Sequence, residues 1–155
     1  MIDLLALAAF NARYAQVIDS DAMEQWPAFF TERCMYRITH VENEREGLAA
    51  GIVYADSRAM LEDRVAALRE ANIYERQRYR HLLGLPLVLS ADGNAAVAHT
   101  PFMVARIMAG SGDTMLFATG VYQDRFVMDG TGLLLAERIA VCDSTVTDTL
   151  MALPL

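Results

Sequence analysis

Three short polar turns divide the second half of the chain, and their spacing constrains the fold more than any other feature. They are residues 91–94 (ADGN), 110–113 (GSGD) and 129–132 (DGTG). Glycine beside Asp, Asn or Ser is typical of hairpin turns. With residues 73–89, the segments between the turns predict four consecutive antiparallel strands. Pro101, which has no N–H for a ladder, predicts a bulge or bend and therefore a curved sheet.

The first half of the chain has helical periodicity instead. Apolar residues recur at three- and four-residue steps over residues 3–18, which predicts an amphipathic helix with Asp3 at its positive end. Asp21 and Glu24 have the spacing of a capping box and predict a second, short helix that Pro27 ends or restarts. We expect its aromatic residues to pack in the core: Trp26, Phe29 and Phe30.

The region between the second helix and the turns combines strands and one more helix. Residues 34–41 have strand composition, the polar run 42–46 predicts a loop, and residues 52–54 predict a short strand. Asp56 and Ser57 offer an N-cap for a helix that runs to Glu70. Helices early and strands late predict one α+β domain over residues 1–155, with the helices packed in a curved, mainly antiparallel sheet.

Composition bounds the partners and the compartment. A net charge of -7 argues against nucleic acid, because phosphate binding needs an excess of Lys and Arg. A hydrophobic fraction of 54% is high for one small core and favours a permanent subunit interface. Cys34 and Cys142 have neither disulfide nor zinc spacing, so we expect two buried thiols. The sequence shows no signal peptide and no membrane span, which predicts a cytoplasmic protein.

The three histidines give weak candidates for chemistry. An iron site assembled from His81, His99 and Asp124 has no supporting spacing. Strand alternation places His81 on the same face as Tyr79, so a general acid–base pair of His81 with Asp124 or Asp143 could lie in the hollow of the sheet. This alternative describes a stand-alone isomerase or dehydratase, or a module that binds a small aromatic around His81.

Two further features allow more than one interpretation. Arg76, Arg78 and Arg80 could form a solvated face, pair with Glu70, Glu75 or Glu137, or contact a partner, for which the planar guanidinium is well suited. The last residues of the chain become more apolar where most domains end in polar residues. They either dock onto their own domain or are buried against a second chain.

Four segments carry a resemblance to a known family. They are residues 18–37 (IDSDAMEQWPAFFTERCMYR), 46–57 (EGLAAGIVYADS), 68–86 (LREANIYERQRYRHLLGLP) and 137–155 (ERIAVCDSTVTDTLMALPL). Over its whole length the chain resembles the small (beta) subunit of Rieske-type aromatic-ring-hydroxylating dioxygenases. The run 78–81 matches the general family pattern, and the last two segments match a narrower group within it.

The resemblance implies a cystatin-like, NTF2-like cone without catalytic, cofactor-binding or metal-binding residues of its own. It places the Rieske 2Fe-2S cluster, the mononuclear Fe(II) and the substrate in a large (alpha) subunit, in an α3β3 hexamer supplied with electrons by a reductase. It also favours partner contact over the other interpretations of the arginines and the tail. The candidate interface residues are Arg76, Arg78, Arg80, His81, Leu150, Met151, Leu153 and Leu155.

Overall fold

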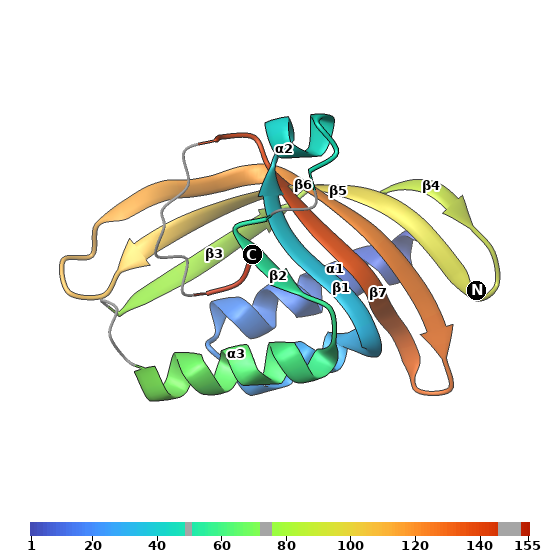
Figure 1. The fold of residues 1–155 in the computed structure, drawn as a ribbon, viewed down its shortest axis with the longest axis horizontal. Helices are drawn as coiled ribbons and strands as arrows, with labels where there is room; N and C mark the ends of the chain where they lie inside the picture. The colour runs from blue at the N-terminus through green and yellow to red at the C-terminus, as the bar shows by residue number, and fades with distance from the viewer. Residues whose placement is uncertain (49–50, 72–75, 146–152) are drawn as a thin grey trace.

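The computed structural model describes residues 1–48, 51–71, 76–145 and 153–155 (Figure 1). No helix among them is long and apolar enough to cross a membrane. The elements follow in the order α1 (Leu4–Asp19), η1 (Met23–Phe29), β1 (Phe30–His40), α2 (Val41–Arg45), β2 (Val53–Ala55), α3 (Arg58–Ala71), β3 (Gln77–Leu83), β4 (Leu87–Ala91), β5 (Ala95–Met108), β6 (Thr114–Asp129) and β7 (Gly132–Cys142).

Within the described residues, seven strands form one sheet in the order β2-β1-β7-β6-β5-β3, with β4 also paired to β5. Every pair is antiparallel except β1 with β7, which is parallel. The long strands curve, and α1 and α3 lie on the hollow side of the sheet (Figure 1). The predicted α+β architecture is confirmed, as are the three predicted turns between β4, β5, β6 and β7.

The two long helices begin as the sequence predicted. Asp3 caps α1 by accepting a hydrogen bond from the Ala6 N–H at 2.8 Å. The Ser57 hydroxyl accepts from the Met60 N–H at 3.2 Å at the start of α3. In both cases a short polar side chain satisfies a backbone donor that the first helical turn leaves without an intrahelical partner.

The predicted capping box is wrong. Residues 23–29 form a 3₁₀ helix with Pro27 inside it and no side-chain cap. Asp21 and Glu24 instead bind Arg69 of α3, at 2.9 Å and 2.7 Å. The two carboxylates do not cap a helix because they form ion pairs with Arg69, and these pairs connect Asp21 and η1 to α3.

The predicted loop at residues 42–46 is also wrong, because Val41–Arg45 is the short helix α2. His40 caps it through Nδ1, which accepts from the Asn43 N–H at 3.4 Å. Glu42 and Glu44 lie in its first turn, where negative charge suits the helix dipole. One and a half turns are too short to show helical periodicity in the sequence.

Of the two predicted alternatives at Pro101, a bulge or a bend, the structure contradicts the bulge. Pro101 pairs with Val121 in register, and the register shift in β5 falls between Val104 and Ala105. The Pro101 carbonyl accepts from the Gly84 N–H at 2.8 Å. Pro101 therefore lies on β5 opposite the break between its two neighbours, β3 and β4. Residues 73–89 therefore contain two strands instead of one, and the missing proline N–H lies at the gap between them.

The core lies between the helices and the hollow face of the sheet. The predicted aromatic packing is confirmed, because Trp26 and Phe30 are buried and the partly buried Phe29 packs against the same core. Edge-to-face contacts link Trp26 to both Phe30 and Tyr36. Both cysteines are free and buried, as predicted. Burial raises the pKa of the Cys142 thiol to about 11, so it stays protonated at neutral pH.

Candidate functional site

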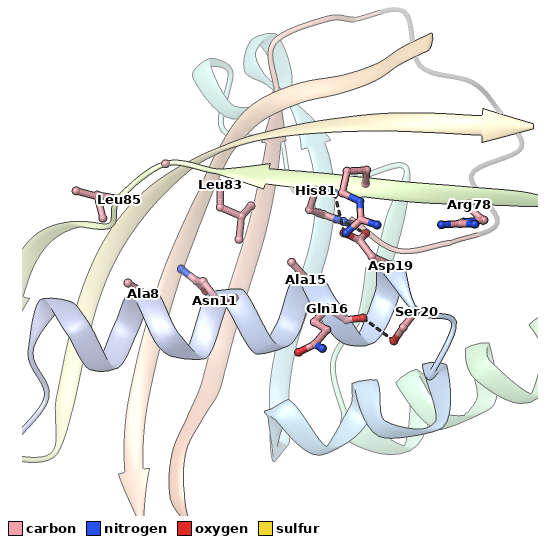
Figure 2. A pocket seen from close by; sticks show the side chains of 13 residues that line it. Ala8, Asn11, Ala15, Gln16, Asp19, Ser20, Arg78, His81, Leu83 and Leu85 are labelled. Carbon is pink, nitrogen blue, oxygen red and sulfur yellow. Dashed lines mark hydrogen bonds and ion pairs between the residues drawn. The ribbon is translucent and has the colours of Figure 1, made fainter. Parts of the chain in front are cut away.

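A groove of about 610 Å³ lies between α1 and β3, and three of the predicted site residues line it: Arg78, Arg80 and His81 (Figure 2). Small side chains of α1 form one wall, and β3 with the residues after it forms the other. Along α1 the groove is lined by three alanines and by polar residues: Asn11, Gln16, Asp19 and Ser20. Along β3 it is cationic at Arg78 and Arg80.

His81 and Asp19 form a buried pair at one end of this groove. Alternation along β3 turns His81 inward, and Asp19 reaches it from the last turn of α1. His81 Nδ1 lies 2.6 Å from Asp19 Oδ1, and the His81 backbone N–H donates to Asp19 Oδ2 at 2.9 Å. The His81 side chain is 0% exposed, and its buried Nε2 has no hydrogen-bond partner among the residues that the structure describes. The pair therefore connects α1 to β3, and its burial keeps the imidazole ring away from any ligand in the groove.

The predicted carboxylate partners of His81 are therefore wrong. Asp124 binds Arg138, and Asp143 accepts from the Thr119 hydroxyl at 2.9 Å. Strand alternation compares residues within the sheet and says nothing of which helix covers them. Asp19 was not among the candidate partners in the sequence, and only the packing of α1 on β3 identifies it.

A second polar cluster fills the centre of the cone. Arg138 Nε and Nη2 each donate to Asp124 at 2.8 Å, and Nη2 also donates to Asn11 at 2.6 Å. The guanidinium lies between two rings, 4.2 Å from the centroid of Tyr14 and 4.1 Å from that of Tyr122. Burial raises the pKa of Asp124, and the charge of Arg138 opposes this shift. Arg138 was missed in the sequence, where the signal was a charged residue at an inward-facing strand position.

The cone interior is thus occupied by packed side chains at the place where an acid–base pocket was predicted. Arg138 and Asp124 are both 0% exposed in their side chains. Among the described residues, no group of three or more His, Cys, Asp or Glu is placed to hold a metal ion. Arg138 and Asp124 therefore pair with each other inside the core and stabilise the fold.

The end of the chain docks onto its own domain. Leu153 and Leu155 are buried, and the Leu155 carbonyl accepts from the hydroxyls of Tyr14 and Tyr36 at 2.9 Å and 3.1 Å. Trp26 Nε1 in turn donates to the Tyr14 hydroxyl at 3.0 Å. Burial in their own core leaves Leu153 and Leu155 no surface for a second chain.

The remaining interface candidates are exposed or lie outside the description. Arg76, Arg78 and Arg80 are exposed along one side of β3. Arg80 Nη1 lies 3.9 Å from Asp19 Oδ2, a longer separation than a direct hydrogen bond. Glu75, one of the predicted internal partners, and the tail residues Leu150 and Met151 lie outside the described residues.

Comparison with known proteins gives relatives of one kind. A family model described as the ring hydroxylating beta subunit matches residues 13–149. The chain is 65% identical over 155 residues, the whole length of both proteins, to the beta 1 subunit of the terminal oxygenase component of terephthalate 1,2-dioxygenase from Comamonas sp.. It is 37% identical to the small subunit of anthranilate 1,2-dioxygenase from Burkholderia cepacia, over 92% of this chain and 88% of that one.

Solved structures agree with this assignment. The β subunit of a candidate aromatic-ring-hydroxylating dioxygenase from Novosphingobium aromaticivorans superimposes with a TM-score of 0.89 at 36% identity, covering 98% of this chain and 96% of that one. The β subunit of benzoate 1,2-dioxygenase from Burkholderia mallei, at 17% identity and 92% coverage of both chains, shares the fold with a TM-score of 0.75. The predicted NTF2-like cone is confirmed, and the chain belongs to the ring hydroxylating beta subunit family.

Proposed function

We propose that this chain is the non-catalytic β subunit of a multicomponent dioxygenase that converts terephthalate to its 1,2-cis-dihydrodiol. The observation that carries this proposal is the full-length identity of 65% with the corresponding subunit from Comamonas sp.. In this proposal the chain supports the assembly of the catalytic large subunit.

The proposal assigns the Rieske 2Fe-2S cluster and the mononuclear Fe(II) to the large subunit. The assembly is an α3β3 hexamer in the cytoplasm, and a reductase delivers the electrons. The name of the Comamonas relative, a terminal oxygenase component subunit beta, supports an α partner. The packing of this chain is consistent with a supporting role, since two buried polar pairs connect its own elements: Asp19–His81 and Asp124–Arg138.

Arg76, Arg78 and Arg80 are proposed to belong to the assembly surface, and Leu150 and Met151 remain candidates for it. An exposed row of guanidinium groups on a chain of net charge -7 is a local positive stripe that an acidic surface can cover. For His81, Leu153 and Leu155 we propose an indirect role. They are buried, so they contribute to assembly only by holding the fold that presents the surface.

The alternative of a stand-alone isomerase, dehydratase or small-aromatic-binding module is not favoured. A general base must come within hydrogen-bond reach of its substrate. His81 Nδ1 is taken by Asp19, and His81 Nε2 is closed off from solvent. The centre of the cone is filled by Arg138 and its partners.

The test is to purify the chain alone and co-expressed with a large subunit of the same family, and to measure iron content and terephthalate turnover with a reductase. We expect iron and dihydrodiol only in the co-expressed complex. A coloured, iron-containing preparation of this chain alone would contradict the proposal. A complex that forms and oxidises another aromatic acid but leaves terephthalate intact would overturn only the substrate.

A further inference from the structure

Leu155 is held in the cone in the way that a protein holds a small ligand. Its carbonyl oxygen accepts from the Tyr14 and Tyr36 hydroxyls at 2.9 Å and 3.1 Å. Its N–H donates to the Tyr36 oxygen at 3.1 Å. Ligand pockets combine an apolar surrounding with a few polar groups that converge on one part of the ligand. Here two phenols from different elements, α1 and β1, converge on one carbonyl group.

The hydroxyls of Tyr14 and Tyr36 are kept as hydrogen-bond donors. Burial raises the pKa of both phenols, so they stay protonated at neutral pH. Trp26 Nε1 donates to the Tyr14 oxygen at 3.0 Å, which leaves the Tyr14 proton for Leu155. Among the described residues, both hydrogen bonds of the Tyr36 hydroxyl go to Leu155. A buried hydroxyl without a partner is costly, so any occupant of this site must present an acceptor.

The surroundings of Leu155 are apolar and select a neutral occupant. Leu153 and Leu155 are buried in the same core as Trp26. The charge of Arg138, which lies against a tyrosine of the site, is already compensated by Asp124. A carboxylate would therefore be buried without a counterion of its own, which is costly. An amide or a ketone presents the same acceptor oxygen without that cost.

We propose that Tyr14, Trp26 and Tyr36 form a binding site for small neutral carbonyl compounds with a branched apolar group, and that Leu155 occupies it as an internal ligand. None of the three residues lines the groove beside His81, so the site is separate from that groove. A compound must displace Leu155 in order to bind. Its apparent dissociation constant is therefore raised by the factor by which the docked state outweighs the released state. The inference depends neither on the substrate of the oxygenase nor on its large subunit.

The test is a titration of the full chain with isocaproamide, the amide that corresponds to leucine without its amino group. The variant Leu155→Ala has a weakened internal ligand, and Trp26, the single tryptophan, reports binding by its fluorescence. We expect the variant to bind isocaproamide at least about tenfold more tightly than the wild type, because its internal ligand competes less well. Isocaproamide should also raise the midpoint of thermal unfolding of the variant more than that of the wild type.

Two matched substitutions in the Leu155→Ala chain test the role of the tyrosines. Tyr36→Phe removes a hydroxyl that contacts Leu155 and should weaken binding of isocaproamide at least about fivefold, as expected for one lost hydrogen bond. Tyr54→Phe changes a tyrosine that is 46% exposed, and it should leave binding unchanged. Isocaproate, the charged acid of the same shape, should bind at least about tenfold more weakly than the amide, because its charge must be buried.

Hydrogen exchange of the Leu155 amide in the wild type shows whether the compound displaces the chain. This N–H donates to Tyr36, so its exchange should accelerate at least about threefold at high isocaproamide. The same measurement decides the question if Leu155→Ala does not fold. If isocaproamide binds the variant but leaves this exchange unchanged, the site is only a cavity made by the substitution. If Tyr36→Phe does not weaken binding, the tyrosines do not recognise the carbonyl group. Either result would overturn the inference.

Discussion

At the scale of single residues, the guanidinium of Arg138 is a fully buried charge that needs partners to compensate for the loss of water. It has lost all contact with water and is compensated by Asp124, by Asn11 and by the faces of two tyrosine rings. Removing one partner of a buried ion pair leaves the other charge uncompensated, which is much more costly than the pair itself is stabilising. The cone is therefore specified by polar groups as well as by apolar packing.

We predict that Arg138→Met lowers the free energy of unfolding by about 3–5 kcal/mol, because Asp124 remains buried without its counterion. The matched control is Arg69→Met, which removes an arginine with two carboxylate partners that are largely exposed. That change should cost less than about 1 kcal/mol, since water screens the pairs. Urea unfolding followed by the fluorescence of Trp26, the single tryptophan, gives both values. Equal losses for the two variants would contradict this account of the core.

At the same scale, Asp19 holds β3 through two hydrogen bonds to one residue, His81. Asp19→Ala leaves the His81 backbone N–H and ring nitrogen without their acceptor, at a cost of roughly 2–4 kcal/mol. Hydrogen exchange should then accelerate in β3 before it does in β6. Asp21→Ala is the control, because Asp21 is also an aspartate near the end of α1 but is mostly exposed. If both variants exchange alike in β3, Asp19 is not the fastening group.

At the scale of elements, the sequence predicted what local patterns determine. The turn residues located β5, β6 and β7, and apolar periodicity with a polar cap located α1 and α3. What it missed depends on contacts between distant segments. Arg69 of α3 took Asp21 and Glu24 from their predicted cap, and α1 supplied the carboxylate for His81. The sequence therefore located His81 on the correct strand, β3, but assigned it Asp124 or Asp143 as a partner in place of Asp19.

The C-terminal element is predicted to stabilise its own chain first. Leu155 is 0% exposed, so Leu155→Ala should lower the free energy of unfolding of the isolated chain by about 2–5 kcal/mol. Leu85→Ala, at a residue 73% exposed, should change it by less than about 0.5 kcal/mol. Thermal or urea unfolding of the isolated chain measures both. A Leu155→Ala variant that is as stable as the wild type but fails to assemble would instead restore the interface interpretation.

At the scale of the whole molecule, apolar residues serve two purposes. A positive mean hydropathy of +0.21 accompanies a core that is already well packed with aromatic side chains, and the excess lies on the surface, with a marked concentration on β4 and beside it. Charge is separated as well, since a chain of net charge -7 keeps a row of arginines at one end of its sheet. Both features are typical of a subunit whose final surface is completed by its neighbours.

We therefore predict opposite effects of a charged β4 on the isolated chain and on the assembly. Leu87→Lys with Leu89→Lys should raise the solubility of the isolated chain, because lysine on an edge strand blocks edge-to-edge association. The two leucines are 63% and 52% exposed, so stability should change by less than about 0.5 kcal/mol for each. The yield of co-expressed complex should fall, whereas Leu116→Lys, at a leucine 59% exposed on β6, should leave it unchanged. Precipitation by polyethylene glycol and the recovery of complex after size-exclusion chromatography measure the two effects. If solubility rises while assembly is unaffected, the β4 edge is free in the oxygenase, and its leucines lie outside every subunit contact.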